Sequence, residues 1–154
     1  MNSDEMLARE AIRKTAALYT RAVDNRRYEE LRHVFFADAT IAVQGGAEMR
    51  GIEQIISAFK TGAEKRGAAA AGNFQRHNLT TSMIEQTDPD NAEAVHYVLV
   101  VTELGFDHAG MYRDLFRRSD DEWLIAKREA RMEWVRPDSR FATWLGQASP
   151  ATTF

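Results

Sequence analysis

The segment that decides the fold is residues 76–102, RHNLTTSMIEQTDPDNAEAVHYVLVVT. Two runs rich in alternating and β-branched residues flank the turn-forming sequence Asp88-Pro89-Asp90-Asn91, so the segment predicts two long antiparallel strands. A second turn signal, Ser119-Asp120-Asp121, separates two further runs of the same kind. The predicted long strands are therefore Arg76 to Glu85, Ala92 to Thr102, Gly110 to Arg118 and Trp123 to Trp134.

The N-terminal half has the periodicity of helices instead. Between residues 3 and 23, apolar side chains recur on one helical stripe, and Ser3 is the expected N-cap. Residues 66–73 (RGAAAAGN) either extend a helix or form a loop. Helices followed by an antiparallel sheet predict an α+β fold in which a curved sheet wraps the helices. The other predicted elements are helices at 28–35 and 52–63 and short strands at 39–43 and 49–51.

The composition limits the classes of function. A length of 154 residues predicts one domain, and 44% apolar with 28% charged residues is typical of soluble globular proteins. The net charge of -3 offers no basic field for nucleic acid or an anionic membrane, and there is no cysteine. The sequence has neither the apolar core of a signal peptide nor a membrane-length apolar run, so we expect a cytoplasmic protein.

Asp24 and His77 are the candidate acid–base pair. Asp24 either ends the first helix in solvent or faces a pocket, and His77 is either structural or catalytic. Strand alternation places His77, Leu79 and Thr81 on one face. A carboxylate that faces a histidine in an apolar pocket fixes its tautomer and raises its basicity, which suits proton abstraction. Tyr19 lies five residues before Asp24, roughly 140° around the helix axis, so the two would flank a cavity.

Other chemical groups give weaker signals. We expect His33 on a helix surface and His108 in a solvated connection, while the face of His96 stays open. No histidines have metal-ligand spacing, so no metal is expected, and phosphate-loop and nucleophile-elbow motifs are missing. The charged run around Arg128 is a solvated face, unless one of its arginines enters the pocket and stabilises an enolate or a leaving anion.

The chain resembles the nuclear transport factor 2-like superfamily and, within it, the SnoaL-like group. The resemblance extends from about residue 5 to residue 136. It implies a cone-shaped roll with one strongly bent sheet, closed by helices around a deep pocket. The segments that carry it are Tyr19 to Asp24, Arg27 to Leu31, Phe35 to Ala39, Arg50 to Ile55, Arg76 to Thr80, Gly110 to Phe116, Glu122 to Ile125 and Met132 to Trp134.

More specifically, the motifs are similar to those of scytalone dehydratase, bile acid 7α-dehydratase and γ-hexachlorocyclohexane dehydrochlorinase. These lyases pair an Asp of the first helix region with a His that begins a long strand, which implies catalytic roles for Asp24 and His77. Tyr19 matches a pocket tyrosine, and Arg128 matches a pocket arginine. The sequence departs from the pattern at Thr81, where many relatives have Asn. The strand that ends at Thr102 also lacks a second acid–base residue, for which only Thr102 or Glu103 could substitute.

The resemblance implies a lyase or isomerase that needs no cofactor and acts on a hydrophobic cyclic or aromatic small molecule. Asp24, His77 and Tyr19 are the predicted catalytic residues. The alternative is a non-catalytic binder or structural subunit, as in the β subunits of aromatic-ring dioxygenases; a hydrolase would need an Asp-Arg-Asp set that the sequence does not supply. The predicted substrate-binding residues are Arg128, Tyr112, Thr81, Thr102, Phe116, Met132 and Trp134.

The resemblance also implies a homo-oligomer, a dimer or a trimer, joined through the outer face of the sheet. Beyond Pro137, the apolar residues Phe141, Trp144 and Leu145 recur at helical spacing. Residues 137–154 are therefore predicted to form a C-terminal tail that acts as a lid over the pocket of one domain spanning residues 1–154.

Overall fold

The computed structural model describes residues 2–67 and 73–142 of the chain. It contains three helical segments and one six-stranded sheet. The helical segments are α1 (Ser3–Asp24), the 3-10 helix η1 (Tyr28–His33) and α2 (Ile52–Lys65). The strands are β1 (Phe35–Val43), β2 (Met49–Arg50), β3 (Gln75–Asp88), β4 (Asn91–Thr102), β5 (Gly105–Ser119) and β6 (Glu122–Val135).

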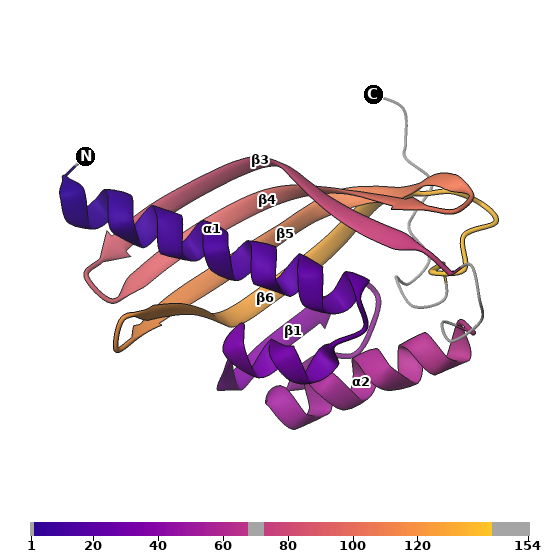
Figure 1. Cartoon of the computed structure of the whole chain (residues 1–154), viewed down its shortest axis with the longest axis horizontal. Coiled ribbons are helices and arrows are strands. Elements are labelled where there is room, and N and C mark those ends of the chain that lie inside the picture. The colour runs from indigo at the N-terminus through magenta and orange to yellow at the C-terminus, as the bar shows by residue number, and fades with distance from the viewer. Residues whose placement is uncertain (1, 68–72, 143–154) are drawn as a thin grey trace.

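The sheet has the strand order β2-β1-β6-β5-β4-β3. Strands β3 to β6 form an antiparallel meander, as the alternation and turn signals predict. Strand β1 adds to β6 in parallel, a pairing that the sequence did not predict. The long strands curve, α1 runs along one face of the bent sheet, and α2 lies beside β1 (Figure 1). The α+β prediction, with a bent sheet around helices, is confirmed.

Helix α1 illustrates how local chemistry sets an element's limits. The N-cap is Asn2 rather than the predicted Ser3, because the Asn2 side chain accepts a hydrogen bond from the Glu5 amide at 2.8 Å. Of the apolar stripe predicted for α1, Ala22 is buried but Leu7 is 69% exposed, and the helix packs into the core through the adjacent face, where Ile12 is fully buried. Other core side chains with no exposed surface are Leu31, Val34, Ile55, Val98, Val100 and Ile125.

β-Bulges decide which side chains face the helices. In β3 the register shifts between Leu79 and Ser82, so the alternation that places His77 inward does not extend to Thr81, which is exposed. A shift between Leu115 and Phe116, opposite Ile125 and Lys127, changes the phase of β6. Arg128 therefore lies inside, only 1% exposed. A one-residue change of phase moves every following side chain to the other face.

Strand β5 begins five residues earlier than its predicted start at Gly110. The register shift against Val100 and Val101 makes Asp107 a bulge residue, so Asp107 and His108 are both buried although they are neighbours. The expectation that His108 is solvated is therefore wrong. From His108 onward the burial alternates regularly through Tyr112.

No helix in the described part of the chain is long and apolar enough to cross a membrane. Of the predicted lid, residues 137–142 are described and Phe141 is buried against the core. Trp144 and Leu145 lie outside the described residues.

Gly110 should be intolerant of a side chain. A Cβ at this position would lie 2.1 Å from the Arg131 carbonyl oxygen and 2.8 Å from Met132 Cα, both backbone atoms that cannot turn aside. We expect Gly110→Ala to lower the free energy of unfolding by about 1–3 kcal/mol or more in urea denaturation. Gly46→Ala is the control, because its nearest contact is 3.4 Å and a change within about 0.5 kcal/mol is expected. Equal effects of the two variants would contradict the close approach of the β6 backbone to Gly110.

Candidate functional site

Asp24 joins the end of α1 to the beginning of β3. Its carboxylate accepts the His77 backbone N–H at 3.0 and 3.2 Å and contacts the His77 ring Nδ1 at 2.6 Å. Both side chains are almost buried, with 6% and 9% of their surface exposed. Because an ionised carboxylate only accepts hydrogen bonds, Nδ1 carries the proton and the lone pair lies on Nε2. His77 is therefore arranged as a base.

Two tyrosines and an arginine form the wall beside His77. The Tyr19 ring packs edge to face against both His77 and Tyr112, with ring centroids 6.5 and 5.8 Å apart. The Arg128 guanidinium carbon lies 4.1 Å from the Tyr19 ring centroid and 4.3 Å from that of Tyr112. Nε and Nη2 of Arg128 donate to the two Asp114 oxygens at 2.7 Å. Nη1 is buried without a hydrogen bond to any described residue.

Burial and charge keep these groups in defined protonation states. Burial raises the pKa of Tyr19, with Arg128 only partly opposing it, and burial raises the pKa of Tyr112 well above its usual value. Both hydroxyls therefore remain protonated donors at neutral pH. Burial opposes the charge on Arg128, but Asp114 outweighs that effect and raises the arginine's pKa. The wall thus presents donors and positive charge, as stabilisation of an oxyanion requires.

A second carboxylate–imidazole pair lies in the same region, and the sequence reasoning missed it. Asp107 Oδ2 contacts His108 Nδ1 at 2.6 Å and accepts a hydrogen bond from the Ser139 hydroxyl at 2.7 Å. The His77 and His108 rings meet edge to face, with centroids 6.4 Å apart. The alternation of β5, extended backwards from Tyr112 through Gly110, would have placed His108 inward.

Both imidazoles and the wall of Tyr19, Tyr112 and Arg128 line a small cavity that is closed on one side by Phe141. Its volume of about 50 Å³ holds at most a few water molecules. Phe141 covers it, packing 5.3 Å from the His108 ring and 4.8 Å below the Arg66 guanidinium, while Arg140 binds Glu103, Asn73 and the Phe74 carbonyl. The lining residues are Tyr19, Val23, Ile41, Val43, Met49, Phe59, Arg66, Gln75, His77, His108, Tyr112, Arg128, Ala130, Met132 and Phe141.

The structure brings together most of the predicted site residues but not all of them. Thr81 lies outside because of the β3 bulge, and Thr102 caps the β4–β5 turn by accepting the Leu104 amide at 3.3 Å. Phe116 is a core residue paired with Ala92 and Ile125. Trp134 is 38% exposed and stacks on Phe106 with centroids 5.0 Å apart. None of these four is among the described residues that line the cavity, so the structure does not bring them to the candidate site.

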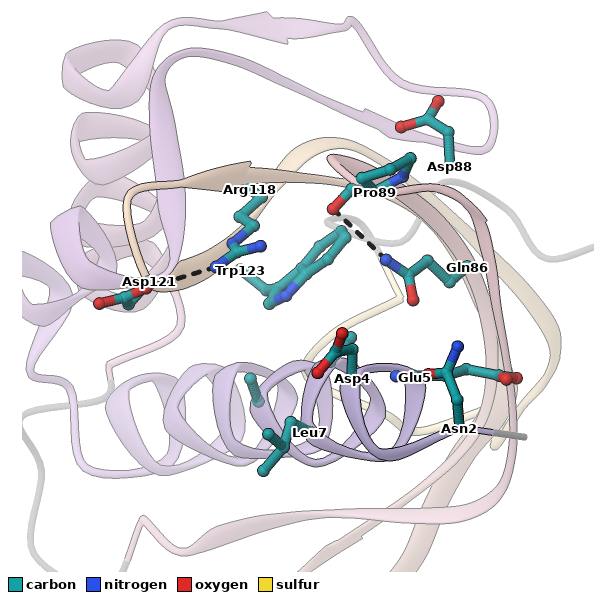
Figure 2. Close-up of a pocket in the computed structure, with 12 residues that line it drawn as sticks. Asn2, Asp4, Glu5, Leu7, Gln86, Asp88, Pro89, Arg118, Asp121 and Trp123 are labelled. Carbon is teal, nitrogen blue, oxygen red and sulfur yellow. Dashed lines mark hydrogen bonds and ion pairs between the residues drawn. The ribbon is translucent and has the colours of Figure 1, made fainter.

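A wider hollow of about 710 Å³ lies between the N-terminus of α1 and two hairpin ends (Figure 2). It is rich in carboxylates, and the polar groups that Figure 2 joins by dashed lines already have partners: Arg118 binds Asp121, and Gln86 donates to the Pro89 carbonyl. Its described lining contains no histidine. The arrangement offers no proton acceptor comparable with His77, so we assign the candidate site to the smaller cavity.

No group of three or more His, Cys, Asp or Glu side chains within residues 2–67 and 73–142 is placed to hold a metal ion.

Comparison with known proteins identifies the family. The SnoaL-like domain matches residues 4–129, most of the chain. The protein belongs to the SnoaL-like family. A search of curated proteins gives no match.

Several solved structures share the SnoaL-like fold. A putative scytalone dehydratase from Novosphingobium aromaticivorans has a TM-score of 0.75 and 17% identity, over 88% of this chain and 91% of that one. Hexachlorocyclohexane dehydrochlorinase LinA-type3 from Novosphingobium barchaimii has a TM-score of 0.75 and 22% identity, covering 87% and 92%. A cystatin-like protein of unknown function from Nostoc punctiforme has a TM-score of 0.69 and 21% identity, covering 85% and 92%. At these identities the likeness establishes the fold alone.

The buried Arg128–Asp114 ion pair, which contacts the rings of Tyr19 and Tyr112, should contribute strongly to the stability of this SnoaL-like domain. Asp114→Asn removes the charge that compensates Arg128, whose side chain is 1% exposed. We expect the variant to lose about 3–5 kcal/mol of unfolding free energy, because an uncompensated charge stays buried.

The matched control is the exposed pair Arg117–Asp38, with 43% and 73% of its side-chain surfaces exposed. Asp38→Asn should cost about 0–1 kcal/mol, since solvent screens that pair. Urea denaturation of both variants makes the comparison, and similar losses would contradict the buried placement of Arg128.

Proposed function

We propose that this SnoaL-like protein is a cofactor-independent lyase or isomerase that begins its reaction by removing a proton from carbon. The observation that carries the proposal is the 2.6 Å contact between Asp24 Oδ1 and His77 Nδ1 at the wall of a cavity. This contact leaves His77 Nε2 as a base, and Asp24 stabilises the imidazolium that forms when the base takes a proton.

The carbon acid would carry a carbonyl group, or another group that accepts the electron pair. When the C–H bond breaks, its electrons move to that oxygen and form an enolate. Tyr19 and Tyr112 stay protonated because burial raises their pKa, so they can donate hydrogen bonds to the oxygen. Nη1 of Arg128, which has no hydrogen bond to a described residue, adds positive charge at the same wall. Preorganised donors of this kind usually stabilise the transition state more than any other single effect does.

The substrate would be a hydrophobic cyclic or aromatic small molecule. The aliphatic and aromatic part of the lining, which includes Ile41, Met49, Phe59 and Met132, suits a ring. A ring is larger than the 50 Å³ cavity, so binding requires Phe141 to move away from His108. In this proposal the C-terminal segment is the lid of the site.

The similar structures agree with this class of reaction. A dehydratase and a dehydrochlorinase are both named for eliminations, and both share the fold over most of their length. We also infer a homo-oligomer, because the outer face of the meander exposes Met83, Tyr97 and Leu115 by 44% or more.

The proposal is tested with 5-nitro-1,2-benzisoxazole, an aromatic carbon acid that ring-opens to a coloured phenolate once a base removes its proton. We expect the wild-type protein to accelerate this reaction and His77→Asn to lower kcat/KM by roughly 10²–10⁴-fold. Asn keeps a donor for Asp24 but has no basic nitrogen. Asp24→Asn should reduce the rate less, because His77 remains but loses its charged partner.

The control is His33→Asn, which changes an exposed histidine and should retain the wild-type rate. Thermal unfolding of each variant shows that the fold is intact. If the probe binds but reacts no faster with wild-type protein than with His77→Asn, the protein is a binder and the lyase or isomerase proposal is wrong.

A further inference from the structure

The proposed proton abstraction by His77 gives no role to a second imidazole that lines the cavity, that of His108, which is paired with Asp107 behind it. We propose that His108 is a second catalytic acid–base residue, which delivers a proton to the leaving hydroxyl of a cyclic β-hydroxy carbonyl substrate. This inference rests on the proposed function and narrows it to dehydration.

The placement of this pair is specific. The bulge at Asp107 turns two consecutive side chains inward, and their exposed surfaces are only 2% and 3%. A buried polar pair is weak evidence for stability, because two apolar residues of similar size would often serve the fold equally well. Ser139 donates a further hydrogen bond to Asp107, so the C-terminal segment that covers the cavity also holds the orientation of His108.

Both imidazoles have the same hydrogen-bonding pattern. Each places Nδ1 on a carboxylate oxygen at 2.6 Å, which leaves each Nε2 free to exchange a proton. The rings are in edge-to-face contact, with centroids 6.4 Å apart and an angle of 80°. In the proposal, a substrate hydroxyl or one water lies between the two Nε2 atoms and exchanges protons with both.

The charges around His108 fix its resting state. Burial lowers the pKa of His108, Asp107 opposes this, and positive charge on His77 and Arg66 adds to the lowering. Phe141, which packs on the ring from the C-terminal segment, carries no charge. His108 is thus neutral at neutral pH and accepts a hydrogen bond from the substrate's hydroxyl. Once protonated, it is a strong donor.

Dehydration requires the transfer of one proton from the substrate's carbon to its leaving oxygen. His77 Nε2 takes the proton from the carbon beside the carbonyl, and the C–H electrons form the enolate. The enolate electrons then return to form the carbon–carbon double bond, and the C–O bond breaks with its electrons on oxygen. The proton passes from His77 to His108 and on to that oxygen, so water leaves and both imidazoles are neutral again. No other reactant is needed.

The test compares two probes that differ in their leaving group, 3-hydroxycyclohexanone and 3-acetoxycyclohexanone, both followed by the absorbance of cyclohex-2-enone. Hydroxide needs a proton to leave, whereas acetate does not. We expect His108→Asn, which keeps a donor for Asp107, to lower kcat/KM by roughly 10²–10⁴-fold on the hydroxy probe and by less than tenfold on the acetoxy probe. His77→Asn should lower both equally, and His33→Asn neither.

A structural role of His108 would reduce both reactions equally, and that result overturns the inference, as does no loss on the hydroxy probe. If the wild-type protein acts on the acetoxy probe but not on the hydroxy probe, the inference about His108 is wrong and the proposed function stands. If the wild-type protein acts on neither cyclohexanone probe, the inference is also wrong. If it fails to accelerate the benzisoxazole reaction as well, the proposed function is wrong too. Should His108→Asn not fold, Ser139→Ala retains the imidazole but loosens Asp107, and the loss must again be confined to the hydroxy probe.

A measurement without substrate checks the coupling of the two rings. In ¹⁵N-histidine-labelled protein, NMR titration should find neutral His108 with its proton on Nδ1. Protonated His77 lowers the pKa of His108, so His77→Asn should raise the His108 pKa by about 0.5 or more, judged from the Coulomb energy at this separation in water. A proton on Nε2, or a His108 pKa that ignores the His77 substitution, contradicts the relay.

Discussion

The contact on which the site depends is the one between the Asp24 carboxylate and both the backbone and ring nitrogens of His77. It connects the last residue of the first helix with the beginning of the first long strand. Neighbouring bonds support the junction, from Gln75 Nε2 to the Val23 carbonyl and from Arg26 to the Asn73 carbonyl. The Asp24 side chain thus both ties the end of α1 to β3 and fixes the tautomer of His77, so fold and proposed chemistry share a constraint.

The second constraint is electrostatic. A cation buried as deeply as Arg128 is costly unless it is paired, and Asp114 neutralises it through two hydrogen bonds. The tyrosine rings on either side add cation–π contacts and exclude water. The pair leaves one guanidinium nitrogen without a hydrogen bond to any described residue, next to the cavity. That orphan donor has a physical explanation if a ligand oxygen completes it.

Much of this arrangement could be predicted from sequence. Periodicity located α1, α2 and the four strands of the meander to within a few residues, except at the start of β5, and the motifs indicated the SnoaL-like family, which the family match confirms. What periodicity could not give is the phase of each strand after a bulge. The bulges move Thr81 to the outside, bring Arg128 inside and bury Asp107 beside His108. A bulge depends on pairing with the neighbouring strand, so no pattern within one strand reveals it.

In the proposed mechanism, the cavity beside His77 binds an enolate-like oxygen at the wall formed by Tyr19, Tyr112 and Arg128. A crystal structure with a bound phenolate, whose charged oxygen mimics that of an enolate, tests this binding mode most directly. We expect the phenolate oxygen within hydrogen-bonding distance of at least one of these three side chains, the ring against His77 Nε2, and Phe141 displaced. A phenolate that instead occupies the hollow beside Trp123, with the cavity still closed by Phe141, would contradict the proposal.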